Sequence, residues 1–181
     1  MFRLISRWMD NTYVYNVLIL ACLILVQVLV CNQIVLFNVA MAFIFIYVII
    51  RLPMDLSPNW LLTWAFLSGL LVDIFSDTPG VNSLACTLLA MLKRPMLFAY
   101  VPKDDRTKNI SPSLATLGFS VYGKYLFSMT LVYCLLVFSI EYFNFADVKE
   151  IAIMSATSAA FTFLILLGVD SLIVPHREKR L

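Results

Sequence analysis

The chain has 181 residues, of which 62% are hydrophobic, 14% are aromatic and 13% are charged. This is more apolar surface than one soluble core of that size can bury, so the composition excludes an ordinary soluble globular protein and predicts an integral membrane protein. The net charge of +2 is small and spread among apolar runs, which excludes a nucleic-acid-binding surface as the main function.

Six apolar runs are candidate membrane spans. A helix needs about 20 residues to cross a hydrocarbon core of ~30 Å, and shorter spans occur where the bilayer thins. Arg3 and Arg7 precede the first run, but no small-residue cleavage site follows it, so we expect a retained helix rather than a signal peptide. The sequence predicts an all-α, polytopic membrane protein with a single domain over residues 1–181 and spans at about 13–31, 35–50, 60–75, 80–92, 117–140 and 151–174.

The positions of the basic residues predict the orientation of these spans. An even number of spans places both termini on one side of the membrane. With the N-terminus inside, twelve of the 13 Lys and Arg residues lie on the inner side and only Lys149 lies outside. We therefore expect a multi-pass membrane protein with both termini in the cytoplasm.

The basic inner segment 93–113 also contains aromatic residues and three prolines, so we expect it to lie at the membrane surface against anionic lipids. A docking platform for a cytoplasmic partner is the alternative. Near the inner end of the last span, Asp170 is expected to pair with arginines of the C-terminal tail. The small residues of "SATSAA", 155–160, predict close helix packing, either within the fold or against another chain.

Enzymatic and metal-binding motifs are missing from the sequence. The four cysteines have no CxxC spacing, and His176 is the single histidine. No HExxH, GxSxG or glycine-rich phosphate loop occurs. We therefore predict a non-enzymatic protein with no catalytic residue, no cofactor and no metal site.

The segment "GLLVDIFSDTPG", residues 69–80, contains two acidic residues at the end of the third predicted span. Gly69, Asp73 and Asp77 recur every four residues, so they share one face of a helix. Residues 77–80 then predict a turn, because Asp bonds nearby amides, Pro fixes its backbone and Gly accepts positive φ. Asp77 or Thr78 is expected to cap the fourth helix.

Asp73 lies about one turn inside the predicted span, where a charged side chain costs on the order of 3 kcal/mol at full depth. Two interpretations stay open from the residues alone: a helix-packing or partner-binding role, and an ion or substrate site. The amides of Asn16, Gln27 and Asn82 are expected to form hydrogen bonds between helices.

"SGLLVDIFSDTPGVNSLACTLLAML", residues 68–92, resembles the signature of the MreD family of rod shape-determining proteins. The resemblance to members from Bacteroidetes-type bacteria is closest in "VDIFSDTPG". The length, the six predicted spans and the short loops are compatible with that family over nearly the whole chain. The family motif positions map onto Gly69, Leu70, Asp73, Pro79 and Gly80.

This resemblance implies a non-enzymatic component of the elongasome in the bacterial inner membrane, which maintains cell shape. The implied partner is MreC, and through it the protein would link MreB filaments to peptidoglycan synthesis by RodA and its transpeptidase. It also implies an architecture similar to the S components of energy-coupling-factor transporters. The candidate partner-binding or helix-junction residues are therefore Gly69, Leu70, Asp73, Asp77, Pro79, Gly80 and Asn82.

A small-molecule-binding subunit of a membrane transporter is the main alternative. In that case Asp73, Asn82 and Asn16 would line a polar cavity for a cationic solute, and the inner basic loop would dock an energising module. A structural membrane protein without a fixed partner is a third interpretation.

Overall fold

The computed structural model describes residues 22–28, 41–54, 56–101, 111–142 and 147–173. All regular secondary structure in these ranges is helical, which confirms the predicted all-α class. Residues 22–28 form a short helical stretch. The labelled helices that follow are α2 (Ile46–Arg51), α3 (Pro58–Ser76), α4 (Val81–Tyr100), α5 (Leu114–Glu141) and α6 (Val148–Ile173).

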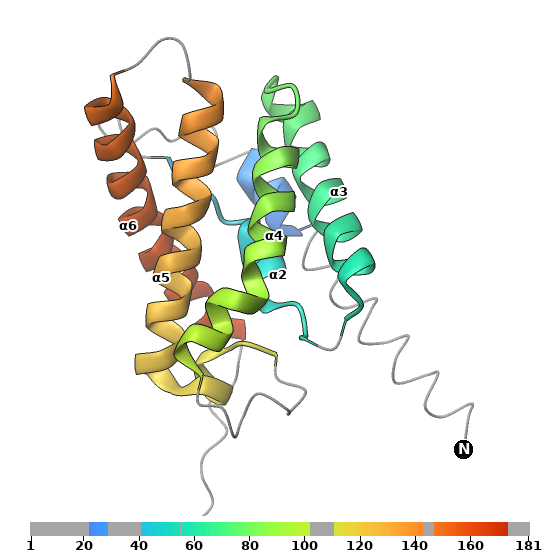
Figure 1. Ribbon diagram of the computed structural model, residues 1–181, viewed down its shortest axis with the longest axis vertical. Helices are drawn as coiled ribbons and strands as arrows, with labels where there is room; N and C mark the ends of the chain where they lie inside the picture. Colours follow the sequence, from blue (N-terminus) through green and yellow to red (C-terminus); the bar gives the residue numbers. More distant parts are fainter. Residues whose placement is uncertain (1–21, 29–40, 55, 102–110, 143–146, 174–181) are drawn as a thin grey trace, which may run out of the picture.

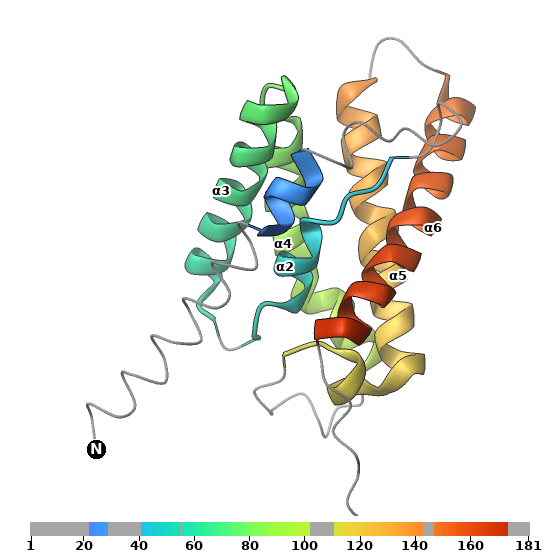
Figure 2. The same cartoon turned by 180° about the vertical axis from the view of Figure 1, so that it is seen from behind.

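The helices form two neighbouring hairpins (Figure 1). α3 packs against α4, α5 packs against α6, and α4 packs against α5 to join the two pairs. Seen from behind, α2 and residues 22–28 cover the seam between the hairpins (Figure 2). Within each hairpin the connection is short, residues 77–80 and 142–147, and a short connection leaves consecutive helices antiparallel and adjacent.

Three helices of the described residues, α3, α5 and α6, are long and apolar enough to cross a membrane. They correspond to the spans predicted at 60–75, 117–140 and 151–174. α3 begins at Pro58, where the missing N–H of proline removes no helical hydrogen bond. Most of the first predicted span, with Asn16, lies outside the described residues.

The second predicted span is not a continuous helix. Residues 41–44 are non-helical, and only the six residues of α2 follow as a helix. Backbone groups of this segment that lack helical hydrogen bonds bind side chains instead, which is the condition for non-helical structure inside a membrane. Ser158 Oγ accepts from Met41 N at 3.0 Å and Thr162 Oγ1 accepts from Phe43 N at 3.1 Å.

Gln27 completes this backbone pairing from the opposite side. Its Nε2 donates to the carbonyl of Ala42 at 2.8 Å, and its Oε1 accepts from Ile44 N at 2.7 Å. The amide therefore binds the backbone of the non-helical segment, whereas the sequence predicted a hydrogen bond between helices for Gln27. On α6, Ser155 and Ala159 are buried whereas Ala156 and Ala160 are exposed, so the small-residue segment packs inward on one side only.

α4 extends further than the predicted span 80–92. It runs through Pro95 to Tyr100, so residues 93–100 are helical rather than part of a surface loop. Lys93 is fully buried and donates to the carbonyl of Leu52. Arg94 donates to the carbonyl of Leu56 at 2.7 Å. Lys93 and Arg94 thus hold the connection between α2 and α3 through its backbone carbonyls. The sequence pattern did not predict this role for them.

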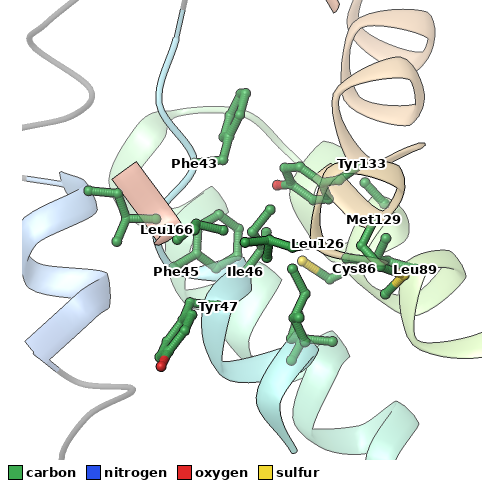
Figure 3. Close-up of a cluster of buried hydrophobic side chains, with 14 of the residues drawn as sticks. Phe43, Phe45, Ile46, Tyr47, Cys86, Leu89, Leu126, Met129, Tyr133 and Leu166 are labelled. Carbon is green, nitrogen blue, oxygen red and sulfur yellow. The ribbon is translucent and has the colours of Figure 1, made fainter. Parts of the chain in front are cut away.

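The core lies where the non-helical segment meets α4 and α5 (Figure 3). Phe43 and Phe45 both make edge-to-face contacts with Tyr133, with ring centroids 5.2 and 5.9 Å apart. This geometry is favourable for aromatic pairs, because the positive ring edge meets the negative ring face. Leu89 and Leu126 are fully buried in the same cluster.

α5 is interrupted near its start. Ser113 caps its N-terminus in a reciprocal pair with Thr116, as in a capping box. Gly118 then has φ 74° and ψ 160°, which is a non-helical conformation that glycine tolerates and other residues avoid. The helix therefore changes direction here, and residues 119–141 form its long straight part.

Candidate functional site

The site predicted at residues 69–82 lies at the tip of the α3–α4 hairpin. α3 ends at Ser76, and its C-cap residue Asp77 has a left-handed φ of 55°. The N–H of Thr78 donates to the carbonyl of Asp73 at 3.3 Å. Gly80, with φ 84°, precedes α4. Both residue types suit these backbone angles, since Gly has no Cβ and Asp tolerates the left-handed region better than most residues.

Asp73 is 4% exposed and joins α3 to the start of α4. Its Oδ1 accepts from Asn82 N at 2.9 Å, from Asn82 Nδ2 at 3.0 Å and from Thr78 Oγ1 at 3.0 Å. Its Oδ2 accepts from Ser83 N at 2.8 Å and from the Ser83 hydroxyl. The carboxylate thus binds the otherwise unpaired first amides of α4, where negative charge is favourable.

This arrangement changes the expected origin of the cap on the fourth helix. The cap was expected from Asp77 or Thr78, but the N-cap residue is Gly80, which supplies no side chain. Asp73 takes that role from the preceding helix. Asp77 is exposed and terminates α3 instead.

Tyr133 connects this hairpin to α5. Its hydroxyl donates to Asn82 Oδ1 at 2.6 Å, and the ring is fully buried. Asn82 therefore bonds both Asp73 and a residue 51 positions away in the sequence. We call Asp73, Thr78, Asn82, Ser83 and Tyr133 the Asp73 junction.

Gly69 is required by the close approach of the two helices. A Cβ at this position would lie 2.5 Å from the carbonyl oxygen of Asn82 and 2.6 Å from Ser83 Cα. Both atoms belong to the backbone, so a side chain here would push α3 and α4 apart. The glycine and Asp73 thus act on the same contact, one by allowing it and the other by bonding across it.

The structure separates the candidate residues into two groups. Gly69, Asp73 and Asn82 are buried together at the junction. The others, Leu70, Asp77, Pro79 and Gly80, are exposed on the outer side of α3 or in the turn. Only the first group contributes to the contact between the helices.

A second buried carboxylate, Asp170 of α6, lies in the other half of the molecule. Its Oδ1 accepts from the hydroxyls of Tyr47 at 2.8 Å and Tyr122 at 3.2 Å, and its Oδ2 accepts from Leu114 N at 2.9 Å. Arg51 reaches Tyr47 Oη at 2.7 Å. We call Asp170, Tyr47, Tyr122 and Leu114 the Asp170 junction.

The described partners of Asp170 are two tyrosine hydroxyls and a backbone N–H, and the tail arginines that were expected to pair with it lie outside the described residues. α2, α5 and α6 meet at this carboxylate, and Tyr47 lies between it and the guanidinium of Arg51. A buried charge is costly unless it is hydrogen-bonded and compensated nearby. Tyr47 donates a hydrogen bond to the carboxylate, and Arg51, which donates to the same tyrosine hydroxyl, supplies the positive charge nearby.

Sequence reasoning missed several residues of both junctions. Ser83 follows Asn82 at the start of a helix, where Asn and Ser are common, so its position carried a weak signal. Tyr133 and Tyr122 carried none, because aromatic residues are frequent throughout this chain. In the described part of the chain, no three side chains of His, Cys, Asp or Glu come together as metal ligands.

Comparisons with family models, with curated proteins and with solved structures found no match for this chain.

Proposed function

We propose that this chain is a non-enzymatic, multi-pass component of the bacterial inner membrane that binds MreC and helps couple MreB filaments to peptidoglycan synthesis. In this proposal six spans place both termini in the cytoplasm, and the architecture is similar to that of an energy-coupling-factor S component. The proposal rests on the motif at residues 68–92, which resembles the MreD signature.

The observation that best supports an adaptor is the hydrogen bonding and close helix contact at the tip of this hairpin. Asp73 accepts bonds from three residues at the start of α4 or in the preceding turn, and Gly69 permits close contact between the helices. A hairpin held in one conformation in this way already has the shape that a partner binds. Less conformational entropy is therefore lost on binding.

The outer face of α3 is the proposed contact for the transmembrane helix of MreC. Leu70, Ile74 and Phe75 are 37%, 67% and 62% exposed, and they follow one another along this face. Asp73 points inward instead, so its contribution to binding is to hold the hairpin in shape. RodA and its transpeptidase would be reached through MreC.

The proposed contact can be tested by co-purification of MreC with tagged variants. Leu70→Ala combined with Ile74→Ala is expected to reduce recovered MreC at least fivefold, because it removes apolar contacts from the partner interface. Ile153→Ala combined with Leu164→Ala makes an equivalent change on α6, where both side chains are also exposed. Equal losses from both pairs, at equal membrane insertion, would argue against a contact on α3.

The second candidate, a small-molecule-binding transport subunit, is favoured by the non-helical segment 41–44 beside the middle of α6. Interrupted helices of this kind form binding sites in many transporters. The expected polar cavity of Asp73, Asn82 and Asn16 has less support, because Asp73 and Asn82 bond each other and Asn16 lies outside the described residues.

One experiment separates these functions. The tagged protein is purified from its native membrane in mild detergent, and co-purifying proteins are identified by mass spectrometry. Recovery of MreC with cell-wall elongation enzymes supports the adaptor. Recovery of an ATPase and coupling subunits without MreC would replace it with solute uptake.

A further inference from the structure

Three tyrosines of α5, Tyr122, Tyr125 and Tyr133, are fully buried and each bonds a different part of the fold. Tyr122 donates to Asp170 of α6 and Tyr133 donates to Asn82 of α4. Between them, Tyr125 donates to the carbonyl of Ile50 in α2 at 3.4 Å. A buried hydroxyl that loses its partner is costly, so each bond restricts the position of α5.

Tyr122 and Tyr133 place the two junctions on one rigid element. They are eleven residues apart, which is about three helical turns and roughly 16 Å along the axis. At this spacing both side chains leave the helix on nearly the same face. The non-helical Gly118 lies outside the interval between them, so the connecting part of α5 is regular helix.

Asp170 also holds both sides of the interruption in α5. Leu114, which donates its N–H to Asp170, precedes Gly118, and Tyr122 follows it. The direction of residues 114–117 is thus set by the same carboxylate that binds the straight part of the helix. Displacement of the straight part would strain or break the bond to Leu114.

We propose that α5 couples the two junctions, so that loosening the Asp170 junction also opens the Asp73 junction, and the reverse. The chain of contacts runs from Asp170 through Tyr122 and the helix to Tyr133, Asn82 and Asp73. The coupling is reciprocal, because both junctions bias the same position of α5. This property belongs to the chain itself and requires no partner, so its test is independent of the proposed function.

Cys86 provides a native reporter of the Asp73 junction. Its thiol is fully buried, one helical turn after Asn82, and it contacts Tyr133. The test measures maleimide labelling of Cys86 in the purified full chain, with mass spectrometry identifying the labelled cysteine. Tyr122→Phe removes only the distant hydroxyl, and we expect it to raise the labelling rate about fivefold or more.

Two controls distinguish coupling from general loosening. Tyr100→Phe deletes a hydroxyl from a tyrosine at the end of α4 that is 37% exposed, and it should leave Cys86 labelling unchanged. Ser155→Cys adds a fifth thiol to the chain, at a buried position of α6 where the serine hydroxyl has no hydrogen-bond partner among the described residues. In the Tyr122→Phe background, labelling at position 155 should stay constant while labelling of Cys86 rises.

The reverse experiment uses Tyr133→Phe and follows hydrogen exchange at the amide of Leu114. We expect exchange at least fivefold faster, although the substitution lies in the other half of α5. Unchanged Cys86 labelling in Tyr122→Phe would overturn the proposal. Equal acceleration at Cys86 and at position 155 would also overturn it, because the whole fold would then be opening.

Discussion

The Asp73 and Asp170 junctions are built around the same chemical group but assembled in different ways. Asp73 bonds residues that are five to ten positions away in the sequence. Asp170 bonds residues that are 48, 56 and 123 positions away. The first junction closes one hairpin, and the second joins three helices from distant parts of the chain.

This difference affects when and how each junction forms. Short loops cost little entropy to close, so Asp73 can reach its α4 partners as soon as the hairpin forms. Asp170 can find its partners only after α2, α5 and α6 have packed. We therefore expect the Asp73 junction to determine the stability of the hairpin, and the Asp170 junction to determine the packing of the whole bundle.

The largest expected effect is that of Asp73→Ala. It leaves two amides and the polar side chains of Thr78, Asn82 and Ser83 without their acceptor, so we expect a loss of about 3 kcal/mol or more in the free energy of unfolding. The measurement is denaturation by SDS in mixed micelles. Glu150→Ala, at an exposed position of α6, should change stability by less than about 0.5 kcal/mol. A similarly small effect at Asp73 would contradict its role in the junction.

Gly69→Ala tests the same hairpin through packing instead of hydrogen bonding. The added methyl group meets backbone atoms, so we expect a loss of about 1–3 kcal/mol by the same measurement. Gly168→Ala is the matched control, since a Cβ at that helical position meets no atom of the described residues within 4 Å. It should leave stability unchanged or raise it by up to about 1 kcal/mol. Equal effects at both glycines would show that the close approach at Gly69 is unimportant.

Asp170→Asn addresses the other junction. The amide keeps one acceptor oxygen but directs its NH₂ group at a donor, so at least one bond is lost and we expect a cost of about 1–2 kcal/mol. The N–H of Leu114 should exchange faster with solvent deuterium than in the unmodified protein. If Asp170→Asn lowered the free energy of unfolding more than Asp73→Ala, the Asp170 junction would contribute more to stability than the Asp73 junction, contrary to this expectation.

The smallest expected effect is that of Asp77→Gly. Asp77 is exposed and has a left-handed backbone, which glycine adopts without a steric penalty. We expect a gain of about 0.5 kcal/mol, because the cost of that conformation is removed. A clear loss in Asp77→Gly would indicate that its carboxylate has a role beyond ending α3.

The turn and the long apolar helices could be predicted because their signals are local. Apolar length indicated α3, α5 and α6, and the residues Asp-Thr-Pro-Gly at 77–80 indicated a turn. The predicted helix at 35–50 was wrong over residues 41–44, because apolar composition does not show that Gln27, Ser158 and Thr162 will bind a non-helical backbone. The helical extension at Lys93 and Arg94 was missed because charged residues there resembled an ordinary inner loop.

The sequence by itself determined the helical class, the apolar helices and the position of the hairpin with Gly69 and Asp73. These features depend on hydropathy, turn residues and spacings within a few turns of helix. Only the tertiary structure decided what the carboxylates bind: Asp73 caps the next helix and is linked through Asn82 to Tyr133, and Asp170 joins Tyr47, Tyr122 and Leu114. The physical reason is that a buried carboxylate must be satisfied by whichever donors the packing brings close, and packing between distant segments leaves no periodic signal in the sequence.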